Sequence, residues 1–214
     1  KKLILLFITT SFVLSQNLIW SVDEQYENGN IKQISYHQKI WQKIELVKIE
    51  TYYENGQIQS ETNYKDGKMD GNQITYYENR KKESEVFYKD GELDGKYIGW
   101  YENGKKMEEA FFKDGELDGK MINYYENGKK RGEAFFKDGE EDGKRTEYYE
   151  NGQKLREGTV KDGEYYVING WNKDGELLVK DGNGKYTLYY ENGQKGSEGN
   201  YKDGEFDGLY TNWY

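Results

Sequence analysis

Acidic side chains are the most numerous groups in this chain that could do chemistry. The 214 residues include 40 Asp and Glu but only one histidine, His37, and no cysteine. Two carboxylates can share the acid and base roles, as in glycoside hydrolysis, but a catalytic site needs one convergent set of unlike groups. Here the acidic residues recur at equivalent positions many times over. We therefore predict that the chain is not an enzyme and has no catalytic, cofactor-binding or metal-binding residues.

Known catalytic and ligand-binding motifs are also missing. The sequence has no phosphate-binding P-loop, no His-Glu-x-x-His zinc motif and no nucleophile elbow. Asp114 and Asp118 stand four residues apart around a turn, but they lack the ligand spacing and the bidentate glutamate of a calcium loop. His37 lies outside the regular repeats, where we expect an ordinary surface or packing role.

The strictest acidic pattern is a column of glutamates, each six residues before the glycine of a Lys-Asp-Gly motif. Its members are Glu61, Glu85, Glu109, Glu133, Glu157 and Glu198. Equivalent positions of successive repeats lie two strands apart in a sheet, roughly 10 Å, so lysines of neighbouring strands can sit between them. We predict a structural Glu–Lys ladder. The alternative is an acidic stripe that binds a basic partner or a divalent cation.

The elements that position these residues follow from an internal repeat. Tyr-Glu-Asn-Gly, or a close variant, recurs at a constant interval, and its copies end at Gly56, Arg80, Gly104, Gly128 and Gly152. Lys-Asp-Gly alternates with it and ends at Gly67, Gly91, Gly115 and Gly139. A fixed period of about 24 residues indicates a stacked array. Asn-Gly and Asp-Gly between aromatic or branched residues predict type I′ hairpin turns. Each repeat should therefore be two strands and two turns, with Arg80 replacing one turn glycine at some cost in stability.

The composition favours the same all-β fold. The chain has 26 glycines and no proline; glycine supplies positive φ in turns, whereas proline would remove hydrogen-bond donors from a sheet. Only 34% of residues are hydrophobic and 33% are charged, a balance that is often typical of disorder. Disordered chains are poor in aromatic residues, however, and this chain has 22 tyrosines.

Alternation along the strands assigns two faces. We expect small residues beside large aromatic ones on the covered face, because this lets a twisted sheet curl without voids. Two sets should share that face: Ile74, Ile98 and Ile122 before the Tyr-Glu-Asn-Gly turns, and Val86, Ala110 and Ala134 in the return strands.

The repeat pattern also divides the chain. The expected parts are an irregular N-terminal cap with one degenerate repeat (16–51), regular repeats (52–163), a shortened irregular repeat (164–192) and a C-terminal repeat (193–214). The cap lacks an Asp-Gly turn, and the end units of repeat arrays differ because they protect exposed edges. In the shortened repeat, two Lys-Asp-Gly motifs end in quick succession, at Gly175 and Gly182.

The first residues have the order of a secretory signal peptide. The basic pair Lys1 and Lys2 precedes the apolar residues 3–14, and a cleavage-site pattern ends before Gln16. The apolar run is short for a transmembrane span; a buried helix or an uncleaved anchor is the alternative. We predict a signal peptide at 1–15 and an exported protein that is periplasmic, on the cell surface or extracellular. The net charge of −9 disfavours nucleic acid and membrane lipid as partners.

The phrase Gly-Lys-x-x-x-Tyr-Tyr-Glu-Asn-Gly-x-Lys-x-x-Glu-x-x-Phe-Lys-Asp-Gly, repeated along residues 52–208, resembles the MORN (membrane occupation and recognition nexus) repeat. It is most similar to the bacterial variant of antitoxin-like and fusobacterial proteins. The resemblance implies an elongated, twisted, single-layer antiparallel sheet of stacked hairpins, curled into an open half-pipe with aromatic residues in its groove. The eukaryotic repeat follows YxGxxxxGxxxGxG. Because this chain departs from that glycine spacing, the lipid binding attributed to eukaryotic members is not carried over.

The second tyrosine of the Tyr-Tyr-Glu-Asn-Gly motif is the candidate contact with a partner. The candidate surface is Tyr77, Tyr101, Tyr125, Tyr149 and Tyr190. Tyrosine is a favoured anchor at interfaces, and repeat arrays present extended binding surfaces. We predict a non-enzymatic scaffold that binds another protein, with antitoxin-like neutralisation of that partner as one form. The competing role of these tyrosines is to pack together and stiffen the sheet.

The alternative function is a cell-wall or glycan-binding surface module. Aromatic, glycine-rich repeats that resemble choline-binding modules hold quaternary ammonium groups in aromatic cages. The period of this chain is longer than in those modules, and Gly-Trp occurs only at Gly99-Trp100 and Gly170-Trp171. Both departures weaken this alternative.

Overall fold

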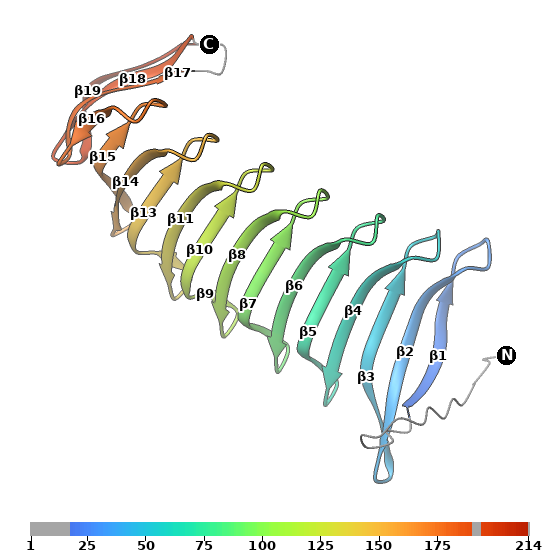
Figure 1. Ribbon diagram of the computed structural model, residues 1–214. Helices are drawn as coiled ribbons and strands as arrows, with labels where there is room; N and C mark the ends of the chain where they lie inside the picture. The colour runs from blue at the N-terminus through green and yellow to red at the C-terminus, as the bar shows by residue number, and fades with distance from the viewer. Residues whose placement is uncertain (1–17, 190–193, 214) are drawn as a thin grey trace. The chain divides into compact units, whose positions relative to one another are not determined.

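The protein is all β. The computed structural model describes residues 18–189 and 194–213, and 19 strands within them form one antiparallel sheet (Figure 1). None of the described residues forms a helix, so no helix long and apolar enough to cross a membrane is found there. The predicted signal peptide at 1–15 lies outside the described residues.

The strands are β1 (Leu18–Gln25), β2 (Ile31–Ile40), β3 (Lys43–Tyr52), β4 (Ile58–Lys65), β5 (Lys68–Tyr76), β6 (Lys82–Lys89), β7 (Glu92–Trp100), β8 (Lys106–Lys113), β9 (Glu116–Leu117), β10 (Gly119–Tyr124), β11 (Lys130–Lys137), β12 (Glu140–Glu141), β13 (Gly143–Tyr148), β14 (Lys154–Lys161), β15 (Glu164–Trp171), β16 (Leu177–Lys180), β17 (Asn183–Tyr189), β18 (Lys195–Lys202) and β19 (Glu205–Asn212).

The chain divides into two compact units. Unit 1 is Lys1–Lys105 with Phe112–Gly115, and unit 2 is Lys106–Phe111 with Glu116–Tyr214. In unit 1, β1 to β7 pair antiparallel in chain order. In unit 2, β8 pairs with β10, and antiparallel pairing continues in chain order to β19.

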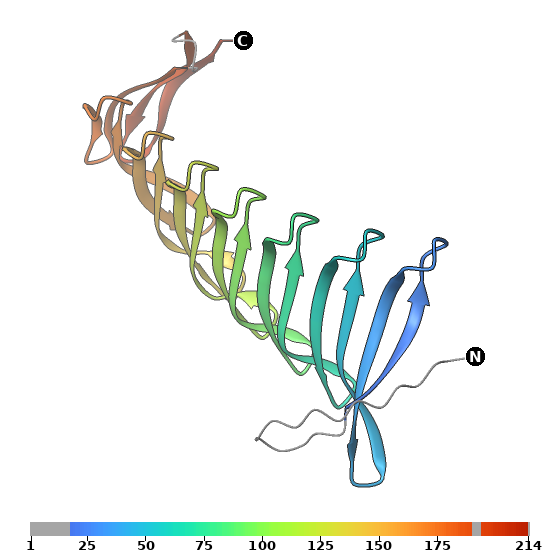
Figure 2. The same cartoon turned by 45° about the vertical axis from the view of Figure 1, so that its right-hand side comes forward.

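Two kinds of turn alternate, one at each end of the strands (Figures 1 and 2). In the Lys-Asp-Gly turns both central residues have positive φ, for example Asp90 at 52° and Gly91 at 95°, as a type I′ turn requires. In the Tyr-Glu-Asn-Gly turns only the glycine has positive φ, for example Gly56 at 80°. This is a type I turn followed by a left-handed residue. The type I′ prediction is therefore confirmed for the first kind of turn and wrong for the second.

The asparagine explains the second kind of turn. Its side chain accepts a hydrogen bond from the backbone two residues on, as Asn55 Oδ1 does from the Gln57 N–H at 2.9 Å. This local bond stabilises the turn without positive φ at asparagine. Arg80 occupies the left-handed position with φ of 69°, as the sequence predicted.

A third glycine, not used in the sequence-based prediction, bends the strand after the Lys-Asp-Gly turns that end at Gly67, Gly91, Gly115 and Gly139. It follows the turn glycine by four residues and has a φ of 104° at Gly71, 128° at Gly95, 116° at Gly119 and 93° at Gly143. In unit 2 this bend separates β9 from β10 and β12 from β13. The position was visible in the sequence as a second repeated Asp-Gly.

The prediction that the Ile and Val/Ala sets share a face is wrong. Ile74 lies opposite Glu85, whereas Val86 lies opposite Gln73, and successive side chains of a strand point to opposite faces. We call the side with Glu85 in unit 1 and Glu133 in unit 2 the ladder face. The side with Val86 and Ala134 is the groove face. Alternation within a strand was read correctly, but the phase between strands depends on turn geometry.

The predicted shortened repeat and the C-terminal repeat share a packed core. Val167, Val179, Tyr186 and Tyr201 are buried together in unit 2. Because β16 has only four residues, the turn that follows reaches its neighbours: the Gly182 N–H donates to the Ile168 carbonyl at 2.8 Å. The irregular spacing therefore has a packing function.

One motif in that repeat folds differently from its sequence. Lys173-Asp174-Gly175 reads as a Lys-Asp-Gly turn, but only Gly175 has positive φ, and its N–H donates to the Asn172 carbonyl at 3.0 Å. It is thus a turn of the Tyr-Glu-Asn-Gly kind, in which Asn172 replaces the tyrosine.

The predicted N-terminal cap also consists of hairpins. Its β2 and β3 have ten residues each, and their tip carries Trp41, which is 92% exposed and has φ of 57°. The tip extends beyond the neighbouring turns of unit 1 (Figures 1 and 2). The capping role stays a prediction.

Candidate binding groove and tyrosine column

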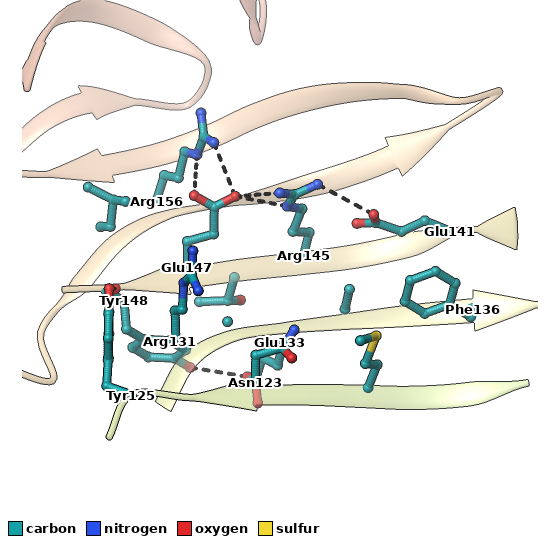
Figure 3. A pocket seen from close by; sticks show the side chains of 15 residues that line it. Asn123, Tyr125, Arg131, Glu133, Phe136, Glu141, Arg145, Glu147, Tyr148 and Arg156 are labelled. Atoms are coloured by element: carbon teal, nitrogen blue, oxygen red, sulfur yellow. Dashed lines mark hydrogen bonds and ion pairs between the residues drawn. The ribbon is translucent and has the colours of Figure 1, made fainter. Parts of the chain in front are cut away.

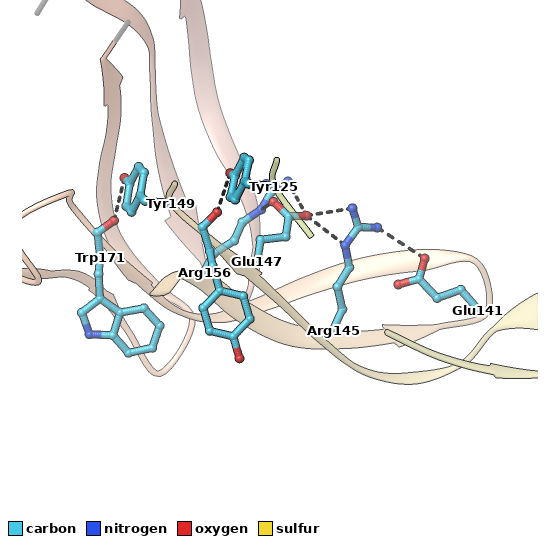
Figure 4. A network of polar contacts seen from close by, with 8 residues as sticks. Tyr125, Glu141, Arg145, Glu147, Tyr149, Arg156 and Trp171 are labelled. Carbon is cyan, nitrogen blue, oxygen red and sulfur yellow. Dashed lines mark hydrogen bonds and ion pairs between the residues drawn. The ribbon is translucent and has the colours of Figure 1, made fainter. Parts of the chain in front are cut away.

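The second tyrosine of each Tyr-Glu-Asn-Gly turn links its repeat to the next. Its hydroxyl donates to the backbone carbonyl that precedes the equivalent tyrosine, or Asn172, one repeat on. The bonds run from Tyr26 to Tyr52 (2.8 Å), Tyr53 to Tyr76 (2.7 Å), Tyr77 to Trp100 (2.6 Å), Tyr125 to Tyr148 (2.7 Å) and Tyr149 to Trp171 (3.0 Å). Figure 4 shows two of these contacts in unit 2.

The asparagine side chains of the turns make a parallel set of bonds. Asn79 Nδ2 donates to the Glu102 carbonyl at 3.1 Å in unit 1, and Asn127 Nδ2 donates to the Glu150 carbonyl at 2.9 Å in unit 2. The packing role of the tyrosines thus rests on direct contacts, while their role in binding a partner stays a prediction. Tyr101 occupies the same repeat position and is half-buried; Tyr190 lies outside the described residues.

The ladder face carries a Glu–Lys ladder, and its partners differ in part from the prediction. Lysines of neighbouring strands pair with Glu61, Glu133 and Glu198 as expected. In addition, a lysine three residues earlier in the same strand pairs with the glutamate, as Lys82 does with Glu85.

Glu133 receives Lys120 Nζ and Lys130 Nζ at 2.8 Å each and the Tyr148 hydroxyl at 3.1 Å. Burial alone would raise the pKa of Glu133, but the hydrogen bonds of the two lysines lower it to about 2. Glu61, Glu85, Glu109, Glu157 and Glu198 each have at least one lysine partner. Among the described residues, no group of three or more acidic or histidine side chains could hold a metal ion.

A groove of about 630 Å³ lies on the groove face of unit 2 (Figure 3). Its lining comes from consecutive strands between β10 and β14 and one adjoining turn, with Met121, Ala134 and Phe136 as apolar contacts. Gly132 of β11 lies within it. The equivalent position holds Ser60, Ser84, Glu108 and Arg156 in other repeats, so the groove is located where one repeat lacks a side chain.

Charged side chains form one wall of the groove (Figure 4). Glu147 lies between two arginines: Arg156 Nε donates to its Oε2 at 2.9 Å and Arg145 Nε to its Oε1 at 2.9 Å. Both guanidinium groups lie over the Tyr165 ring, 5.1 and 5.3 Å from its centre. Burial opposes ionisation of Glu147, yet the hydrogen bond and charge of Arg156, with those of Arg145, lower its pKa. This wall is held in place by paired charges.

Polar groups on this face that have no hydrogen bond or ion pair within the described part of the chain include the Arg131 guanidinium, the Asn123 amide and the Glu108 carboxyl. Arg131 is exposed and lines the groove beside Asn123. Glu108 lies opposite Asn123 on β8, and burial raises its pKa. Sequence reasoning missed these residues. The signal for Arg131 was the rarity of arginine, since three of the four arginines of the chain line this groove.

The repeats that carry these features match a known family model, described as MORN repeat variant, at residues 47–66, 69–90, 93–114, 117–138, 141–162 and 182–203. The matches cover more than half of the chain. The chain belongs to the MORN repeat variant family. The MORN repeats include the whole groove wall from Glu141 to Arg156, and the gap between the last two matches coincides with the irregular β15–β16 region.

Other comparisons add little to the family match. No match is found among curated proteins. A porin-like protein from Bacteroides uniformis ATCC 8492 aligns with 95% of this MORN repeat chain and 91% of its own length at 9% identity. Its TM-score of 0.22 carries no argument about fold or function.

Proposed function

We propose that this MORN repeat protein is a non-enzymatic scaffold that binds another protein through the groove face of its sheet. The groove in unit 2 carries this proposal, because it combines apolar contacts, the candidate residue Tyr125 and an unpaired arginine on one surface. Tyrosine and arginine are enriched at binding hot spots. The hydroxyl of Tyr125 bonds within the chain, so we assign the contact with the partner to its ring.

A capture experiment with matched variants tests this function. The full chain is immobilised, exposed to an extract of the cells that make it, and the retained proteins are identified by mass spectrometry. Wild type and Tyr125→Phe should retain the same protein, whereas Tyr125→Ala should lose most of it. Retention on purified peptidoglycan or choline resin, with elution by choline, would instead support the cell-wall module.

We also propose export, on the strength of the basic and apolar residues at 1–15. The measurement is N-terminal sequencing of the protein recovered from cell fractions. A chain that begins at Gln16 in an extracytoplasmic fraction supports export, and an uncleaved chain confined to the cytoplasm contradicts it. Antitoxin-like neutralisation is the narrower form of the proposal; it requires that the captured protein be a toxin whose activity the chain suppresses.

A further inference from the structure

We infer that the groove around Gly132 binds an extended, acidic segment of a partner protein, with a carboxylate of that segment paired to Arg131. The inference rests on the proposed scaffold function and describes the chemistry of its partner. It goes beyond the turn tyrosines such as Tyr125, because the residues that would recognise the segment are Arg131, Asn123 and Gly132.

The space at Gly132 is not a requirement of the backbone. The φ of Gly132 is not positive, so its backbone conformation does not require glycine. A Cβ added there would lie 3.7 Å from the Thr146 carbonyl oxygen, which is an ordinary van der Waals contact. Serine stands at the equivalent positions 60 and 84. A side chain is therefore tolerated here, and the glycine leaves room for something from outside the chain.

The free charge in the groove is positive. Arg145 and Arg156 are both bound to Glu147, whereas Arg131 is exposed and unpaired among the described residues. A guanidinium group matches the two oxygens of a carboxylate, and charge-assisted bonds of this kind are stronger than neutral ones. The net charge of the chain is −9, which disfavours acidic ligands in general, so selection of an acidic ligand depends on this local unpaired cation.

The shape of the groove fits a polypeptide better than a small molecule. All its lining residues come from neighbouring strands and one turn of a single sheet layer, so one side of a ligand stays exposed. Small-molecule sites bury roughly 70–90% of the ligand surface. An extended chain compensates through more contacts: Met121 and Ala134 can pack against an apolar side chain, and the Asn123 amide can both donate to and accept from a peptide group.

Peptides with a three-residue period are suitable probes. Three residues of an extended peptide span about 10 Å, which is close to the width of the two strands of one repeat. The acidic residues of such a peptide recur at this interval, so several alignments of the peptide place one of them opposite Arg131. The probes are the dodecapeptides (Asp-Leu-Ser)₄, its charge-reversed form (Lys-Leu-Ser)₄ and a neutral (Asn-Leu-Ser)₄. Because the chain has only four arginines, ¹⁵N-arginine labelling gives four side-chain Nε–Hε NMR signals, with Arg80 of unit 1 as an internal reference.

The acidic peptide should shift the Arg131 signal in a saturable way and leave Arg80 unmoved. Arg131→Gln should weaken binding roughly tenfold, the size expected for a lost charged hydrogen bond, and Gly132→Ser should weaken it by filling the groove. Arg80→Gln is the control and should bind like wild type. Equal binding of the lysine peptide, equal shifts at Arg80, or unchanged affinity of both groove variants would overturn the inference. If the peptide fails but Tyr125-dependent capture succeeds, the scaffold function stands and only the acidic segment is wrong.

Discussion

At the scale of single residues, the tyrosines have different structural roles at different positions of the repeat. The tyrosine of the Tyr-Glu-Asn-Gly turn uses its hydroxyl to join consecutive repeats, as Tyr77 does with the Trp100 carbonyl. The preceding tyrosine bonds the glutamate of the ladder face, as Tyr148 does with Glu133. The high tyrosine content is therefore explained largely by contacts within the sheet.

Tyr77→Phe tests the first of these roles. The change removes one hydroxyl but keeps the ring, so the free energy of unfolding should fall by about 1 kcal/mol in denaturant titrations followed by circular dichroism. Tyr88→Phe is the matched control, since Tyr88 is also half-buried in unit 1 but makes no hydrogen bond within the described part of the chain. Equal stability losses in the two variants would contradict the inter-repeat bond.

The residues of the groove could be predicted only in part. Tyr125 came from the repeat pattern, and the structure places it in the lining. Arg131 and Gly132 differ from the residues at equivalent positions of other repeats. A prediction based on the repeat pattern treats such differences as random sequence variation. Whether Arg131 is free to bind a ligand depends on which neighbouring charges are already paired, such as Arg145 with Glu147. Only the three-dimensional structure shows these pairs.

At the scale of elements, the sequence predicted turns better than faces. Asp-Gly and Asn-Gly located the regular hairpins, because positive φ favours glycine; in the one exception, Arg80 takes the place of the glycine. The phase between strands was wrong for Ile74 and Val86, because Ile74 pairs with Glu85 on one face while Gln73 pairs with Val86 on the other. A two-residue turn at Asn79-Arg80 gives this pairing, so the predicted turn and the predicted faces did not agree. Alternation within one strand does not give the phase of the next strand, which the length of the connecting turn sets.

Arg80 offers a direct measure of turn strain. It is exposed, has φ of 69° and occupies a position that is glycine in most other repeats. A left-handed conformation costs a non-glycine residue about 1–2 kcal/mol, so Arg80→Gly should raise the free energy of unfolding by about 1 kcal/mol.

Gly56→Ala is the counterpart of this change in the same unit. A Cβ at Gly56 meets nothing within 4 Å, but the φ of 80° remains unfavourable. The variant should lose stability by a similar amount in the same denaturant titration. Changes of the same sign in both variants would show that turn strain does not control stability here.

At the scale of the whole molecule, the repeat sets the family and the fold class, while local breaks set the packing. The all-β antiparallel fold follows from the spacing and the turn residues, and the motif resembled the MORN repeat, which the family match confirms. The division into two units has no counterpart in the sequence, where the repeat period runs unbroken from Gly56 to Gly152. The core around Val179 could not be predicted either. In the sequence, the shortened strand cannot be distinguished from random variation in repeat length.

We expect the glutamate ladder to make the free energy of unfolding depend on pH in the acidic range. The folded pKa of Glu133 is about 2, below its ordinary value of 4.5, so its ionised form stabilises the folded state. That contribution is complete above about pH 5 and is lost as the pH falls through 4.5 towards 2. Glu157 shifts in the same direction. The free energy of unfolding should therefore decrease steadily between about pH 5 and pH 2.

Glu133→Gln tests the ladder as the source of this dependence. The variant loses both lysine pairs, so it should be less stable than wild type at pH 7. It should also lose less stability than wild type on acidification, because the titrating group is gone. Glu140→Gln is the control, since Glu140 is exposed and has no ion pair among the described residues; its pH profile should follow wild type. Identical profiles for Glu133→Gln and wild type would assign the acid sensitivity to other carboxylates.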